Sequence, residues 1–252
     1  MSRPVVLLPP SKGKAEGGDG ASYGQRLGSN PALAAARERL LRAVVEAADE
    51  LDDRSIARLT GVKTDRADAQ RPLLARLGSA ATMPAHRRYT GVVHSHAGLE
   101  QLDPARLGVD VRIVSALLGL CALDEPVPDY RLEIGASLPP LGGLGRFWRE
   151  QLADHLSQLA AGARVWDLLP AEHAVVWPPQ QRPAADIVAV RFVRPDGRAA
   201  PAARVKIAKG RLVAALVAAP QLEPCDVAEQ VDLGSTWTVS STGSEVVATD
   251  RG

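Results

Sequence analysis

Cysteine, lysine and long apolar runs are all scarce in this sequence, and each scarcity excludes certain kinds of protein or site. The two cysteines, Cys121 and Cys225, lie far apart and form neither a CxxC pair nor a Cys/His zinc pattern. Such usage is typical of buried structural thiols in a reducing compartment, so we expect a cytoplasmic protein. The early apolar run VVLL is too short for the core of a signal peptide, and no run approaches the length of a membrane-spanning helix.

Familiar catalytic motifs are also missing. The sequence contains no GxxxxGK[ST] loop, no GxGxxG after a strand and no HExxH, so P-loop, dinucleotide and zincin chemistry have no support from it. The formal charge is +1, from 30 basic and 29 acidic residues. A near-neutral chain has no global field to hold a polyanion, so any anion site must come from local clustering of basic side chains.

Strand and helix patterns interleave along the chain and predict a single mixed α/β domain over residues 1–252. RPVVLLPP combines consecutive aliphatic residues with flanking prolines, which is typical of a buried strand. We expect a glycine-rich surface loop over 11–30, then a helix from Asn30 to about Asp49 with Arg37 on its solvated face. The later predicted elements are a helix over 144–162, strands near 164–168, 174–177, 186–193 and 203–207, a helix over 210–219 and a closing hairpin over 236–249.

The stretch RSIARLTGVKTDRADAQRPLLARL, residues 54–77, predicts two short helices joined by a turn at Gly61 and Lys63. A helix-hairpin-helix of this kind directs backbone amides toward a phosphate and adds the charge of a lysine, without reading bases. An ordinary helix-turn-helix corner of the core is the alternative that the pattern leaves open.

The segment HSH puts His94 and His96 on one face of a predicted strand, where two imidazoles could bind a metal. No third ligand lies nearby in the sequence, so we expect exposed or hydrogen-bonded histidines and no metal site. Four carboxylates could form pairs for acid-base chemistry, but nothing fixes their separation. We therefore expect solvated loop charges at Glu100, Asp103, Asp124 and Glu125.

Arginine occurs 25 times and lysine only five times. A lysine in such a chain indicates a place where a compact ammonium group is favoured over a planar guanidinium. The five lysines fall in three places: the loop after the first strand (Lys12, Lys14), the hairpin turn (Lys63) and the segment KIAKGR (Lys206, Lys209). If these places meet in space they form an anion site, and if they do not they are three independent solvated turns.

Several segments together resemble the YaaA peroxide-stress family. PPSK keeps Pro10 and Lys12 of the family's Ser-Pro-Ala-Lys, and YTG at 89–91 repeats its Tyr-Thr-Gly. VSALLGLCALDEPVPDYRLEIG is similar to its Leu-Ser-Gly-Leu-Tyr-Gly and Tyr-Arg-Leu-Glu-Met-Gly signatures, and DYRLEIG is the most specific part. FW at 147–148 and KIAKG at 206–210 match its Phe-Trp helix and its Lys-Lys-Ala-Arg-Gly.

The resemblance implies a cantaloupe-like fold with a helix-hairpin-helix element and a positively charged cleft. It also implies DNA binding and a role in limiting free iron and oxidative DNA damage during peroxide stress. By this resemblance, the cleft is expected to be lined or approached by Lys12, Lys63, Arg131, Lys206 and Lys209. Two segments depart from the family pattern, DLLPAEH and VDLGSTWTV, and the departure puts the last third of the cleft in doubt.

Two hypotheses of function follow. The first is a DNA-binding protection protein without classical catalysis, whose affinity is sequence-independent and falls steeply with salt. Its expected contacts are Lys12, Lys14, Gly61, Lys63, Tyr89, Tyr130, Arg131, Lys206 and Lys209. Arg131 and Glu133 are expected to form an ion pair, either in the cleft or as a buried structural pair. The alternative is an enzyme acting on a nucleotide or another phosphorylated or carboxylated small molecule, with Glu133, Glu172 and Lys12 as catalytic residues. Neither hypothesis calls for a cofactor or a membrane.

Overall fold

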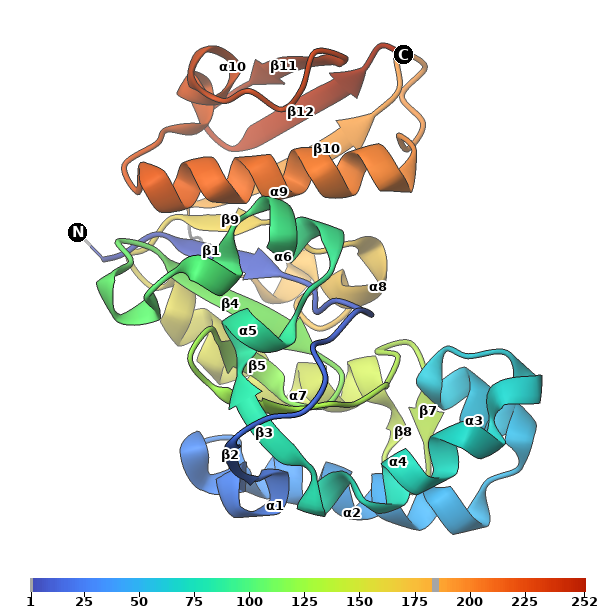
Figure 1. Ribbon diagram of the computed structural model, residues 1–252. Coiled ribbons are helices and arrows are strands. Elements are labelled where there is room, and N and C mark those ends of the chain that lie inside the picture. The colour runs from blue at the N-terminus through green and yellow to red at the C-terminus, as the bar shows by residue number, and fades with distance from the viewer. Residues whose placement is uncertain (1, 183–185) are drawn as a thin grey trace.

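The chain is built around a seven-stranded mixed sheet (Figure 1). The computed structural model describes residues 2–182 and 186–252. Across the sheet the strands are β11 (Trp237–Ser241), β12 (Glu245–Asp250), β10 (Ile187–Val193), β9 (Val165–Asp167), β1 (Val5–Leu8), β4 (Asp110–Ser115) and β5 (Gly119–Ala122). The five inner strands are parallel, and both edge strands are antiparallel to their neighbours. The predicted single-domain α/β class is confirmed.

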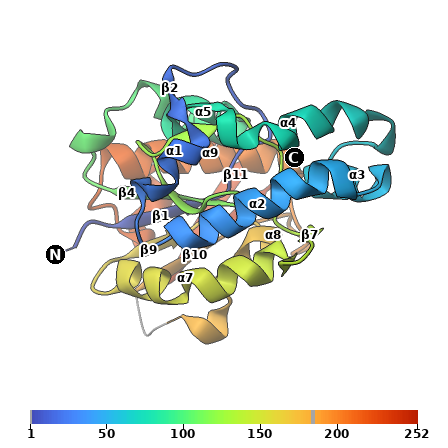
Figure 2. The same ribbon diagram turned by 90° about the horizontal axis from the view of Figure 1, so that it is seen from below.

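Helices cover both faces of this sheet. α6 (Val92–His96) and α9 (Ala202–Ala218) lie together on one face, and α7 (Leu144–Ala160) lies on the other (Figure 1 and Figure 2). β1 is therefore enclosed from both sides, which explains why all four residues of VVLL are buried. α2 (Ala34–Glu50) lies beyond the β5 edge of the sheet (Figure 1).

Shorter elements connect these parts. One small sheet contains β2 (Gly20–Ser22), β3 (Ala81–Pro84) and β6 (Pro126–Pro128), and another contains β7 (Ser137–Leu138) and β8 (Gly142–Gly143). The short helices are α1 (Tyr23–Arg26), α3 (Asp53–Thr60), α4 (Arg71–Ala75), α5 (Ala85–Arg88), α8 (Ala171–Ala174) and α10 (Val227–Gln230). Within the ranges described above, no helix has both the length and the apolar character needed to span a bilayer.

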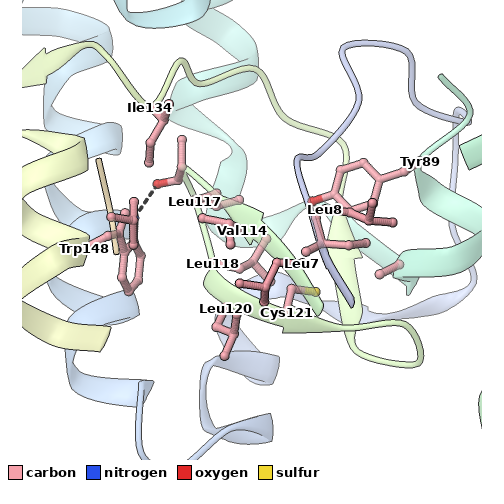
Figure 3. Packing of buried hydrophobic residues seen from close by; sticks show 14 of the residues in the cluster. Leu7, Leu8, Tyr89, Val114, Leu117, Leu118, Leu120, Cys121, Ile134 and Trp148 are labelled. Carbon is pink, nitrogen blue, oxygen red and sulfur yellow. Dashed lines mark hydrogen bonds between the residues drawn. The ribbon is translucent and has the colours of Figure 1, made fainter. Parts of the chain in front are cut away.

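The hydrophobic core connects α7 to the inner strands. Trp148 of α7 is fully buried, and its Nε1 donates a 2.8 Å hydrogen bond to the carbonyl oxygen of Ala116, just after β4 (Figure 3). Leu7 of β1 and Val114 of β4 belong to the same cluster (Figure 3). Replacing a buried tryptophan of this kind by alanine costs about 3–5 kcal/mol, so Trp148 fixes the position of α7 against the sheet.

Two charges predicted separately to be solvated, Arg37 and Glu125, form a buried pair in the core. Arg37 of α2 is fully buried, pairs with Glu125, and donates 3.0 Å hydrogen bonds to the carbonyl oxygens of Leu118 and Leu120. The prediction of solvated charges at Arg37 and Glu125 is therefore wrong. The physical reason is that carbonyl groups at the start of β5 face α2 and need a donor, since a buried unpaired carbonyl is costly.

Several predicted elements have a different conformation in the structure. Residues 203–207 are the first part of α9, which begins at Ala202, and residues 174–177 lie at and after the end of α8. His94 and His96 lie in a helix, α6, and the predicted loop 11–30 contains β2 and α1. Cys225 is exposed and not a core thiol. Short apolar patterns such as Val205 and Ile207 fit either period, and tertiary packing decides between them.

The predicted hairpin at 54–77 has a regular first half. α3 is capped by Asp52, whose side chain accepts a 2.7 Å hydrogen bond from Ser55 N, and it ends at Gly61 with φ 68°. The second half is not one continuous helix. Two 3₁₀ turns, Thr64–Arg66 and Asp68–Gln70, precede the five-residue α4.

Candidate functional site

A pocket of about 720 Å³ opens at the carboxyl ends of β1, β9 and β10. Its walls include residues 9–14 after β1, residues 170–173 after β9, and Phe192 near the end of β10. β1 pairs with β4 on one side and with β9 on the other, so the strand order changes direction here. Open α/β sheets bind ligands at such a switch point. The volume lies within the roughly 300–1,000 Å³ of small-molecule sites.

Three exposed basic side chains, Lys12, Arg131 and Lys206, stand on the pocket wall, and we call them the outer cations. Lys12 Nζ lies 2.7 Å from Glu133 Oε1. This pair takes the place of the expected pair between Arg131 and Glu133. Within residues 2–182 and 186–252, no carboxylate lies within 4.0 Å of Arg131 or Lys206.

The turn after α3 holds Glu133 at the mouth of the pocket. Glu133 N donates a 2.9 Å hydrogen bond to the carbonyl oxygen of Leu59. At Gly61, with φ 68°, a Cβ atom would lie 2.0 Å from Glu133 Oε1. Glycine is therefore needed at this position for two reasons, the left-handed backbone and the close approach of the carboxylate.

Two further lysines, Lys14 and Lys209, lie deeper, and we call them the inner lysines. Lys14 is partly buried, donates a 2.9 Å hydrogen bond to Ser11 O, and lies 4.3 Å from the centroid of the Tyr130 ring. Lys209 is only 9% exposed and donates to the carbonyl oxygen of Leu168. Burial lowers the pKa of each ammonium group from its usual 10.5 to about 8.

A chain of hydroxyl groups lies behind Lys14. Ser115 Oγ accepts hydrogen bonds from the amides of Leu117 and Leu118, both at 3.1 Å. Its own hydrogen is therefore donated to Tyr130 Oη at 2.7 Å, and Tyr130 Oη lies 2.9 Å from Tyr89 Oη. Burial raises the pKa of both phenols, so both stay protonated at neutral pH.

Two buried histidines complete the wall. His94 is 2% exposed, and its Nε2 donates a 3.1 Å hydrogen bond to the carbonyl oxygen of Pro9. His173 lies 3.6 Å from the exposed Glu172 carboxylate through its Nδ1. Burial lowers the pKa of both imidazoles to about 4, so at neutral pH they are uncharged and leave the lysines as the positive groups of the interior.

The loop that carries Lys12 and Lys14 is anchored by Arg88. This fully buried side chain donates to the carbonyl oxygens of Ala15, Gly17, Ala81 and Val127. Sequence reasoning missed Arg88, because one arginine among many carries no signal of burial. It also missed Phe192, because nothing in the sequence distinguishes this residue from the other apolar residues of its strand.

The structure brings most of the expected site residues to one pocket and leaves three outside its wall. On the wall are Lys12, Lys14, Tyr130, Arg131, Glu133, Glu172, Lys206 and Lys209. Tyr89 Oη lies 2.9 Å from Tyr130 Oη, Gly61 lies against the Glu133 carboxylate, and Lys63 is exposed. The catalytic roles expected for Glu133, Glu172 and Lys12 stay predictions.

A family model described as peroxide stress protein YaaA matches residues 5–233. This chain belongs to the YaaA family. The resemblance found in the sequence is thereby confirmed, and the match includes every residue of the pocket wall.

Curated relatives carry the name UPF0246. One from Streptomyces coelicolor is 36% identical over 239 residues, which are 91% of this chain and 90% of the relative. One from Corynebacterium efficiens is 34% identical over 139 residues, 55% of this chain and 54% of the relative. One from Corynebacterium glutamicum is 31% identical over 139 residues, with the same two shares.

Proposed function

We propose that this chain acts in the peroxide stress response by binding DNA largely independently of sequence, and so helps to limit iron-driven oxidative damage. The outer cations carry this proposal. Arg131 and Lys206 are exposed on one pocket wall, with no carboxylate of the described residues within 4.0 Å. Basic side chains of this kind contact phosphate oxygens, which fixes a strand without reading its bases.

The turn after α3 supports the same proposal, because it offers a phosphate contact of the helix-hairpin-helix type. Thr60 lies on the pocket wall, Gly61 borders Glu133, and Lys63 is exposed two residues later. The amides of Gly61 and Val62 already donate to the carbonyl oxygen of Ala57, so the proposed phosphate contact at this turn is the ammonium group of Lys63. The charge on the cleft is local, as the near-neutral chain requires.

Fluorescence anisotropy with labelled random-sequence duplexes at about 50 mM salt tests the proposal. We expect measurable binding by the wild-type chain, and a loss of several-fold for Arg131→Ala and for Lys206→Ala that is equal for all sequences. Arg146→Ala is the control, because Arg146 is exposed, pairs with Glu150 at 3.1 Å, and is not on the pocket wall. Absence of binding at this low salt would overturn the proposal.

A further inference from the structure

The two inner lysines form no ion pair with any of the described residues. Among the described residues, no carboxylate lies within 4.0 Å of Lys14 or Lys209. The acidic group that acts most strongly on Lys14 is Asp129, which is exposed and forms no ion pair with Lys14, followed more weakly by Glu133, which pairs with Lys12 at 2.7 Å. The acidic group that acts on Lys209 is Asp167, which pairs with Arg182 at 2.6 Å. Buried charges in proteins are normally paired, because removing an ion from water without a partner is costly.

The rest of the interior supplies no negative charge. His94 and His173 are buried and lack any charge at neutral pH, and the Glu172 side chain is 61% exposed. The remaining wall is largely apolar, with Val93, Ile134, Val205 and Phe192 among its members. A ligand that fits these surroundings has anionic groups for the lysines and an uncharged, mainly apolar body between them.

The two ammonium groups belong to different parts of the sheet. Lys209 donates to Leu168, directly after β9, and Lys14 lies over Tyr130, which is hydrogen-bonded to Ser115 at the end of β4. β1 is the strand between β9 and β4. At the usual strand spacing, β9 and β4 are about 10 Å apart. This placement beside two different strands favours a separate anionic group for each lysine.

We propose that the interior of the pocket binds a small organic molecule with two anionic groups, one at Lys14 and the other at Lys209. The groups are carboxylate or phosphate, and an uncharged, mainly apolar body joins them. This goes beyond the proposed DNA contact, which uses the outer cations, and it assigns the inner lysines a ligand of their own.

Isothermal titration calorimetry with straight-chain dicarboxylates from malonate to suberate tests this inference at neutral pH and low salt. We expect an optimum chain length that binds at least tenfold more tightly than the monocarboxylate of the same length. Lys14→Met and Lys209→Met, which keep the side-chain volume and remove one charge, should each lower the affinity of that dicarboxylate to that of the monocarboxylate. A parallel series with one carboxylate replaced by a phosphate ester identifies the preferred anionic group.

Arg211→Met is the matched control, because Arg211 lies two residues after Lys209 on α9 and pairs with Asp232 at 3.4 Å, away from the pocket wall. We expect it to bind the dicarboxylates as wild type does. Thermal unfolding of each variant shows that it is folded. Affinity that does not vary with chain length, or that neither lysine variant changes, would overturn the inference whether or not the chain binds DNA.

Discussion

Lys209 keeps an ammonium group at 9% exposure, an uncommon state for lysine. The carbonyl oxygen of Leu168 satisfies one of its N–H groups but does not balance its charge. Burial lowers the pKa of Lys209 from 10.5 to about 8, opposed only by Asp167. A shift of this size corresponds to roughly 3 kcal/mol of lost stability at neutral pH. A residue that costs stability in the ligand-free protein is typical of a binding site.

Lys209→Met should therefore raise the free energy of unfolding at pH 7 by about 1–3 kcal/mol, since methionine fills a similar volume without a charge. The gain depends on pH. Because the folded-state pKa of Lys209 is about 8 and the usual value is 10.5, the unfolded state binds more protons between these values, and wild type gains stability as the pH rises through them. Urea unfolding at pH 7 and at pH 10.5 measures both effects, and the advantage of the variant should shrink at the higher pH. A variant less stable than wild type at pH 7 would contradict this account.

At the scale of single elements, the turn after α3 affects the site directly, because its left-handed residue Gly61 lies against the Glu133 carboxylate. Gly61→Ala would place a Cβ atom 2.0 Å from Glu133 Oε1 at a φ of 68°. We expect a loss of stability of about 2–4 kcal/mol, from backbone strain and from displacement of the carboxylate that pairs with Lys12. Thermal unfolding with calorimetry gives the loss.

Gly98 offers a matched control for this change. Its φ is 65°, and nothing lies within 4 Å of the Cβ position. Gly98→Ala therefore reports the strain of the left-handed backbone alone, about 1–2 kcal/mol. If both variants lost the same stability, the contact between the turn and Glu133 would have no energetic role.

Elements with a strong local pattern could be predicted from the sequence. VVLL forms β1 because four consecutive aliphatic residues suit a strand buried on both faces, and α7 follows the apolar spacing that includes Trp148 and Leu152. The first turns of α9 were not predictable, because small residues leave no clear stripe. Further along α9, a Cβ at Gly210 would lie 2.5 Å from His96 Cβ, so the close packing of α9 on α6 depends on tertiary contacts that the sequence pattern does not show.

The site could be predicted only in part, because the sequence does not show how close its distant elements lie in space. Lysines marked the loop after β1 and the helix α9, but the pattern gave no distance between them. That distance follows from the strand order, because β9 lies late in the sequence but pairs with the first strand, β1. The divergent segment DLLPAEH illustrates the limit, since it supplies the Leu168 carbonyl and His173 to the pocket.

At the scale of the whole molecule, five parallel strands bring distant segments to one end of the sheet. The three outer cations come from three different segments of the chain: Lys12 from the loop after β1, Arg131 from the segment after β6, and Lys206 from α9. A formal charge of +1 over the chain means that attraction of a polyanion depends on this local grouping. Few phosphates can therefore be neutralised at one time.

Under the proposed function, this grouping sets the salt dependence of DNA binding. With the three outer cations and Lys63 as four phosphate contacts, the slope of log K against log salt concentration should be roughly −3.6, and the affinity should fall by about two orders of magnitude between about 50 and 200 mM salt. Lys206→Ala should lower the magnitude of the slope by about 1, because one phosphate contact is lost. Anisotropy titrations at four salt concentrations give both slopes, with Arg146→Ala as the control. A slope near −10 would require many more contacts than the outer cations and Lys63 provide, and an unchanged slope in Lys206→Ala would remove α9 from the contact surface.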